Sequence, residues 1–80
     1  MSITPGPLSF ALQQSMRFID FLLAQYGTIN RSALMDYFGI SVVQASADLQ
    51  RYLVLAPGNL EYDKHSKVYK RTDQFKRVWL

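Results

Sequence analysis

Residues 34–49 read LMDYFGISVVQASADL, and their glycine, apolar and small residues are spaced as in two helices joined by a tight turn. Gly39 tolerates a positive φ, so the chain can reverse there between two helices. Ile40 follows as an apolar residue that fills the angle between the helices. Ala45 is small enough to let the second helix approach the first, and Leu49 anchors the far end of the second helix. These residue types at these offsets predict a helix-turn-helix.

The helix after the turn begins with a capping box. We expect the Ser41 hydroxyl to accept the amide of Gln44, and the Gln44 side chain to reach back toward the cap. The helix is expected to end near Leu53. The preceding helix is expected over Arg31–Phe38, with Asn30 as its cap. The inward residues are expected to be Leu34 and Phe38 in that helix, and Ala45, Leu49, Tyr52 and Leu53 in the next.

An amphipathic helix is predicted upstream, from about Ser9 to Tyr26, with Gly27 as its C-terminal cap. Its inward face consists of Leu12, Met16, Ile19, Leu23 and Tyr26, spaced four, three, four and three residues apart. Four further apolar residues lie outside this face, and we expect a second subunit to cover them: Phe10, Phe18, Phe21 and Leu22. Before this helix, the two prolines and the glycine of residues 5–7 favour an extended arm over residues 1–8.

A β-hairpin is predicted after the last helix. Residues 60–62 and 68–71 alternate between apolar and polar, and the intervening residues 63–67 are polar and typical of a turn. We expect Tyr62 and Tyr69 to pack under the hairpin, and residues 28–29 to form a short extended link. The order of helix, link, helix, turn, helix and hairpin is that of a winged helix-turn-helix. We therefore expect a mostly α domain over residues 9–72, with a three-helix core and a small β-hairpin as the wing.

Composition excludes several classes of function. The chain of 80 residues is 49% hydrophobic and lacks cysteine, which excludes disulfides, thiolate zinc sites and cysteine nucleophiles. Its carboxylates are scattered and its glycines isolated, so we expect no catalytic site, no cofactor and no metal. The longest strongly apolar run, residues 21–24, is far below the ~20 residues that span a bilayer. We expect a cytoplasmic protein without a membrane partner.

The distribution of charge suggests an edge that faces a polyanion, and it is equally consistent with a solvated, lysine-rich surface. Together with the helix-turn-helix, it makes double-stranded DNA the expected partner. The net charge is only +3, but residues 63–80 hold six of the nine basic residues against two acids. In the major groove, uncharged side chains of the last helix would read bases: Ser41, Val43, Gln44, Ser46 and Ala47. Phosphates would meet residues that flank the motif or lie in the wing: Arg31, Arg51, Lys64, His65, Lys67 and Lys70.

Each of these assignments has a plainer alternative. Gln44 belongs equally to the capping box, and the two roles can alternate. Arg31 and Arg51 are equally consistent with surface ion pairs, worth about 0–1 kcal/mol each. For His65 the plainer alternative, a solvated turn residue, is the more usual role of a lone histidine in a turn. Asp48 would be repelled by phosphate, so we expect it to face the protein and to pair with an arginine.

Residues 17–21, 30–32, 38–49, 55–63 and 67–69 resemble the N-terminal winged helix of WYL-domain transcriptional regulators of the BrxR/CapW type, which are associated with bacterial phage-defence loci. The most specific part is APGNLEYD at residues 56–63. The resemblance implies a homodimeric bacterial repressor that binds a palindromic operator and is regulated through a downstream ligand-sensing domain. It also implies that Ser41, Val43, Gln44 and Ser46 face DNA, supported by Arg31 and the wing.

The sequence departs from that family by stopping at residue 80, before any WYL domain. We therefore expect residues 73–80 to lead toward a regulatory domain that this sequence does not contain, and we expect no small-molecule ligand on these 80 residues. A different class of function is a winged-helix protein-interaction module without a DNA role. The modest net charge and the absence of Lys or Arg from the groove face of the last helix favour that alternative.

Overall fold

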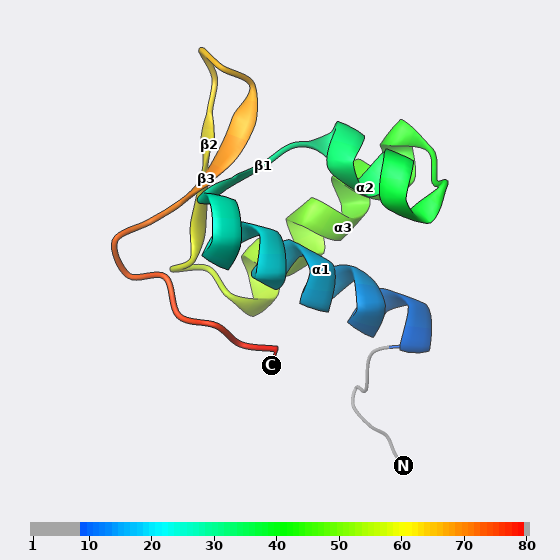
Figure 1. The fold of residues 1–80 in the computed structure, drawn as a ribbon, viewed down its shortest axis with the longest axis horizontal. Helices are drawn as coiled ribbons and strands as arrows, with labels where there is room; N and C mark the ends of the chain where they lie inside the picture. Colours follow the sequence, from blue (N-terminus) through cyan, green and yellow to red (C-terminus); the bar gives the residue numbers. More distant parts are fainter. Residues whose placement is uncertain (1–8, 80) are drawn as a thin grey trace.

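The computed structural model describes residues 9–79 (Figure 1). The expected arm at residues 1–8 lies outside the described residues. The elements follow in the order α1 (Phe10–Tyr26), β1 (Thr28–Ile29), α2 (Arg31–Phe38), α3 (Val42–Leu55), β2 (Leu60–Asp63) and β3 (Val68–Arg71). This order confirms the predicted fold class, a mostly helical domain with a small β-hairpin.

The hairpin belongs to a three-stranded antiparallel sheet in the order β1-β3-β2. The short link at residues 28–29 is its third strand, with Ile29 opposite Tyr69. In the hairpin, Tyr62 lies opposite Tyr69, and their ring centres are 4.9 Å apart. In Figure 1 the hairpin stands at one end of the molecule and the turn between α2 and α3 at the other. The sheet therefore closes one end of the helical core and projects the hairpin tip beyond it.

The helix ends follow the sequence closely. The side chains of Ser9, Asn30 and Ser41 each accept a backbone amide three residues later, and thereby cap the starts of α1, α2 and α3. Gly39 ends α2 in the left-handed conformation, with φ of 65°. The second half of the predicted capping box is wrong, because the Gln44 side chain binds Asp48 instead of reaching back to the cap.

Buried residues from all three helices and the sheet form one core. Its fully buried members include Met16, Ile19, Leu23, Leu34, Ala45, Leu49 and Tyr52, which confirms the inward positions predicted for them. The predicted inward position of Tyr26 is wrong, because its side chain is 70% exposed. At that end of α1 the chain turns into β1, and Ile29 enters the core instead. Tyr69 is buried as expected, whereas Tyr62 is only half covered.

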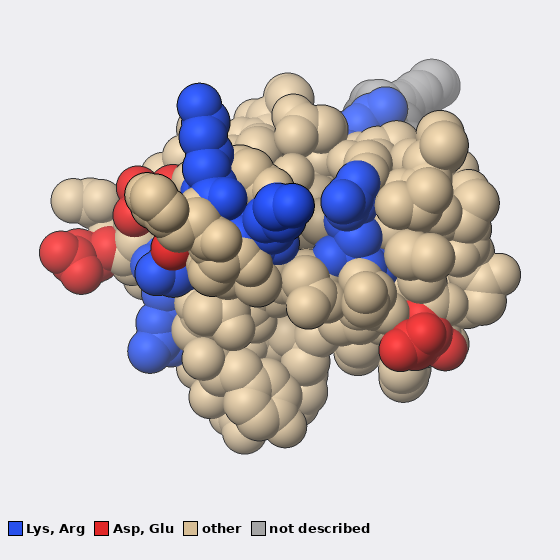
Figure 2. Space-filling view, turned by 90° about the horizontal axis from the view of Figure 1, so that it is seen from above, with Lys and Arg blue, Asp and Glu red and all other residues tan. Residues whose placement is uncertain are grey.

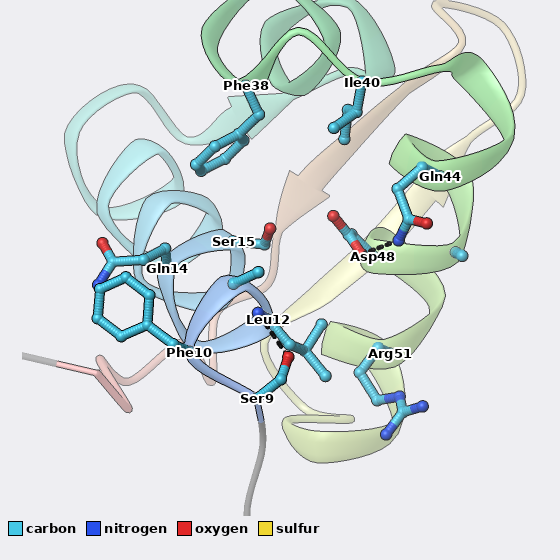
Figure 3. Close-up of a pocket in the computed structure, with 12 residues that line it drawn as sticks. Ser9, Phe10, Leu12, Gln14, Ser15, Phe38, Ile40, Gln44, Asp48 and Arg51 are labelled. Carbon is cyan, nitrogen blue, oxygen red and sulfur yellow. Dashed lines mark hydrogen bonds between the residues drawn. The ribbon is translucent and has the colours of Figure 1, made fainter.

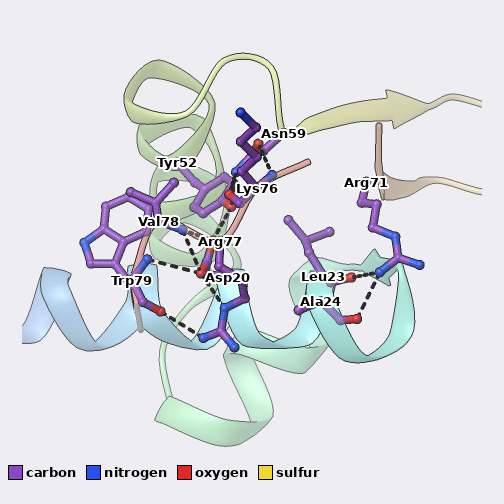
Figure 4. Close-up of polar contacts among 10 residues, drawn as sticks. All are labelled: Asp20, Leu23, Ala24, Tyr52, Asn59, Arg71, Lys76, Arg77, Val78 and Trp79. Carbon is purple, nitrogen blue, oxygen red and sulfur yellow. Dashed lines mark hydrogen bonds and ion pairs between the residues drawn. The ribbon is translucent and has the colours of Figure 1, made fainter. Parts of the chain in front are cut away.

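The chain beyond β3 folds back onto α1 through a buried carboxylate, Asp20 (Figure 4). Arg77 Nε donates to Asp20 Oδ2 at 2.8 Å, and the backbone amides of Val78 and Trp79 donate to the same oxygen at 3.1 and 3.2 Å. The Tyr52 hydroxyl of α3 donates to Asp20 Oδ1 at 2.8 Å. Asp20 therefore joins α1, α3 and the segment after the wing.

Two residues complete this cluster. Burial raises the pKa of the Tyr52 phenol, so its hydroxyl stays protonated and continues to donate. The Asn59 side chain donates to the Tyr52 hydroxyl at 3.1 Å and also exchanges hydrogen bonds with the backbone of Lys76. The residues that donate to Asp20 are all distant in sequence, and nothing in the periodicity of α1 indicates them.

We predict that Asp20→Ala lowers the free energy of unfolding by about 3–5 kcal/mol, because Arg77 and two amides would lose their buried acceptor. Urea denaturation followed by circular dichroism measures this change. Asp36→Ala removes an exposed carboxylate from α2 and should change stability by less than about 0.5 kcal/mol. A decrease below about 1 kcal/mol for Asp20→Ala would show that the cluster contributes little.

Candidate nucleic-acid interface

The first turns of α3 present an exposed, mostly uncharged face. Ala45, Leu49 and Tyr52 hold the opposite face of α3 in the core. We call the exposed side of these turns the outer face of α3. The five residues predicted to read bases lie on or beside it: Ser41, Val43, Gln44 and Ala47 are exposed, and Ser46 is half-buried. Within residues 9–79 no part of the chain covers this face, and a major groove is wide enough to admit one helix.

Arg31 approaches α3 from the start of α2. Its guanidinium donates to Ser46 Oγ at 3.4 Å, a long hydrogen bond between exposed groups. This interaction places a positive charge on one flank of α3, next to the outer face. Arg51 is exposed on the opposite flank, where it borders a groove between α3 and α1.

The polar pair Gln44 and Asp48 lies on that second flank. Gln44 Nε2 donates to Asp48 Oδ1 at 2.9 Å, and the side chain of Asp48 is buried. The expected facing of Asp48 toward the protein is confirmed. The expected ion pair with an arginine is wrong for residues 9–79, where Asp48 makes no ion pair. Helical side chains lean toward the N-terminus, so Asp48 meets Gln44 one turn earlier rather than Arg51.

The groove beside this pair has a mainly apolar surface, although polar side chains also line it (Figure 3). It has a volume of about 700 Å³ and lies between the start of α1 and the turn that joins α2 to α3. Phe10, Leu12, Phe38 and Ile40 contribute apolar surface. Phe10 is the most exposed of these, at 77%.

Basic residues of the wing fall into two groups. Lys64, His65 and Lys67 lie in the exposed turn between β2 and β3. Lys70 lies on β3, where its Nζ is 2.7 Å from Asp63 Oδ2. Asp63 also accepts the amide of His65 at 2.9 Å, so the same carboxylate orders the turn. Lys70 is thus neutralised by a neighbour, an arrangement that the sequence did not indicate.

The face that carries the hairpin tip is rich in positive charge. Figure 2 views the molecule from above Figure 1, and Lys and Arg side chains gather over the hairpin and the centre of this face. Acidic side chains lie toward its two sides, and some of those on the left lie directly beside basic side chains. A backbone of phosphates is the kind of partner that such a distribution attracts.

The four apolar residues expected to meet a second subunit divide into two pairs. Phe18 stacks on Tyr37 with ring centres 4.3 Å apart, and Leu22 packs against the core. These two residues therefore have apolar partners within their own chain, contrary to the expectation that all four needed a second subunit. Phe10 and Phe21 remain exposed on α1.

Among residues 9–79, no helix is long and apolar enough to cross a membrane. The same residues contain no group of three His, Asp or Glu side chains that could hold a metal ion.

The three helices, the three-stranded sheet and the projecting hairpin define a winged helix-turn-helix domain with an exposed third helix. Residues 11–80 match the family model described as the BrxR transcriptional regulator winged helix-turn-helix domain. The chain belongs to this family.

Several proteins with similar sequences are named DNA-binding transcriptional repressors. The chain is 53% identical over 68 residues to the DNA-binding transcriptional repressor CapW of Escherichia coli (strain KTE188), a match that covers 85% of this chain and 23% of that protein. It is 51% identical over 67 residues to the CapW repressor of Pseudomonas aeruginosa, covering 84% of this chain and 22% of that protein. The chain therefore spans less than a quarter of the length of these curated relatives.

We predict that the Asp63 carboxyl titrates well below its ordinary range. The ion pair with Lys70 and the amide of His65 lower the pKa of Asp63 from 3.8 to about 2. Because the folded pKa is depressed, the associated stabilisation is present above pH 4 and disappears as the pH falls toward 2.

Carbon-detected NMR titration of the side-chain carboxyl measures this value. Lys70→Met should raise the pKa of Asp63 toward 3.8, whereas Lys64→Met, which removes a lysine from the adjacent turn, should leave it near 2. An unchanged pKa in Lys70→Met would show that the ion pair does not hold Asp63.

Proposed function

We propose that this chain is the sequence-specific DNA-binding domain of a bacterial transcriptional repressor, acting in the cytoplasm on double-stranded DNA. The exposed, small and uncharged face at the start of α3 carries the proposal, because such a face can approach base edges closely. The similarity to proteins named DNA-binding transcriptional repressors supports it. The role is one of binding, and we assign no catalytic residue.

We propose that α3 lies in a major groove, with its N-terminal turns closest to the bases. Val43 and Ala47 contact thymine methyl groups, while Ser41, Ser46 and Gln44 offer hydrogen bonds to base edges. Contacts to phosphate set the register without reading sequence. They come from both flanks of α3 and from the tip of the wing, through Arg31, Arg51, Lys64, His65 and Lys67. Lys70 contributes less, because Asp63 already compensates its charge.

We further propose that the protein binds a palindromic operator as a homodimer, in the control of phage-defence genes. Palindromic sites mirror the two-fold symmetry of dimeric helix-turn-helix proteins. The exposed side chains of Phe10 and Phe21 on α1 are the candidates for contact with the second subunit. Because the relatives are much longer, we also propose that residues 73–80 connect the domain to a regulatory part of a longer chain.

We predict a strong dependence of DNA binding on salt. A dimer that makes about six phosphate contacts should give a slope near −5 in a plot of log K against log salt concentration. Lys64→Gln should weaken selected and random duplexes by the same factor, and should make the slope shallower by about one for each phosphate that is no longer neutralised. Fluorescence anisotropy on a labelled duplex, selected from a random pool, measures both quantities.

Lys76→Gln is the matched control for this experiment. It removes the same charge from the exposed segment after the wing, which lies near the end of α3 but away from its first turns and from the tip of the wing, and should leave the slope unchanged. A wild-type affinity that does not vary with salt would contradict the proposed phosphate contacts.

A further inference from the structure

Asp48 is an unusual residue for its position in α3. It lies on the inward side of the helix beside Ala45, Leu49 and Tyr52, and only 4% of its surface is exposed. An apolar residue there would pack without the cost of desolvating a carboxylate. Within residues 9–79, the side-chain hydrogen bond made by Asp48 is the one from Gln44, at 2.9 Å. Packing of the core therefore does not account for this acid.

The hydrogen bond between Gln44 and Asp48 fixes the orientation of the Gln44 amide. A carboxylate accepts hydrogen bonds and donates none, whereas an amide group has one donor side and one acceptor side. Asp48 therefore selects the nitrogen of Gln44 and turns its oxygen away. Figure 3 shows the Gln44 nitrogen directed at Asp48 and the oxygen on the other side of the amide. A neutral amide in place of Asp48 would accept either orientation.

We propose that Asp48 is a positioning residue that presents the Gln44 oxygen to DNA and thereby makes the contacted base an adenine. This inference rests on the proposed function and names the base that one residue of that interface reads. With one Nε2 hydrogen bound to Asp48, Gln44 offers Oε1 as an acceptor and its second Nε2 hydrogen as a donor. Adenine presents the matching pair, the N6 donor and the N7 acceptor.

The other bases match this orientation less well. Guanine presents O6 and N7, so an acceptor would face the Gln44 oxygen. Thymine presents the acceptor O4, and cytosine presents the N4 donor without an adjacent acceptor. A bidentate match that only adenine completes corresponds to a preference for adenine of about 10-fold or more.

The experiment compares wild type with Asp48→Asn. Duplexes are first selected from a random pool with the wild-type protein, and the base pair whose preference disappears in Gln44→Ala marks the contact of Gln44. Affinities are then measured for the four duplexes that differ only at that base pair. Wild type should prefer adenine by about 10-fold or more. Asp48→Asn has the same shape but lets the Gln44 amide turn. This variant should prefer adenine by less than about 3-fold, and its affinity for the guanine duplex should rise most relative to adenine.

A purely structural role for Asp48 would weaken binding at every position alike. The ratio among four duplexes for one sample does not depend on the folded fraction, so a partly unfolded variant still reports the preference. Asp48→Leu, which packs in the core and leaves Gln44 without its partner, should relax the same position. Asp36→Asn removes an exposed carboxylate of α2 and should leave the ratio at the wild-type value.

Three results are decisive. An adenine preference that persists in Asp48→Asn overturns the positioning role. A wild-type preference for guanine, thymine or cytosine at the Gln44 position overturns the assigned orientation. A wild-type protein that enriches no sequence from the pool instead contradicts the proposed function itself, and the two failures are thereby distinguished.

Discussion

The close approach of α3 to the rest of the core is the constraint on which the interface depends. Ala45 has no side chain beyond Cβ and is fully buried, so α3 can lie directly against its neighbours. Leu49 and Tyr52 continue the same packing along the helix. Because one face is held so firmly, the opposite face with Val43 and Ala47 has to remain exposed. The left-handed Gly39 and the cap at Ser41 then fix the direction in which that face points.

Hydrogen bonds connect α3 to the segment that follows the wing. Tyr52 reaches from α3 to Asp20, and Asp20 binds the backbone of Val78 and Trp79. The ring of Trp79 lies 5.6 Å from that of Tyr52. The segment after the wing is therefore fastened to the helix that we propose to enter DNA, through a buried and fully bonded carboxylate rather than through surface contacts.

Local spacing allowed the helices, their caps and the exposed face of α3 to be predicted from sequence. The predictions of side-chain contacts failed where the two residues are distant in sequence, or where the contact depends on a residue being buried. The spacing of Ser41 and Gln44 indicated a capping box, but it could not show that a buried Asp48 would bind the glutamine side chain. Alternation placed Lys70 on a strand, but it could not show the register, which pairs Lys70 with Glu61 and leaves Asp63 as the diagonal neighbour that Lys70 binds. The roles of the individual interface residues remain predictions.

In the proposed complex, the outer face of α3 and the tip of the wing meet DNA together. The most direct measurement is an NMR titration of the ¹⁵N-labelled chain with a selected duplex, following the backbone amides. We expect the changes in chemical shift to concentrate on residues 41–50 and 64–67. Changes confined to α1 and the apolar groove beside it, with the start of α3 unaffected, would contradict this proposal and favour an interaction module.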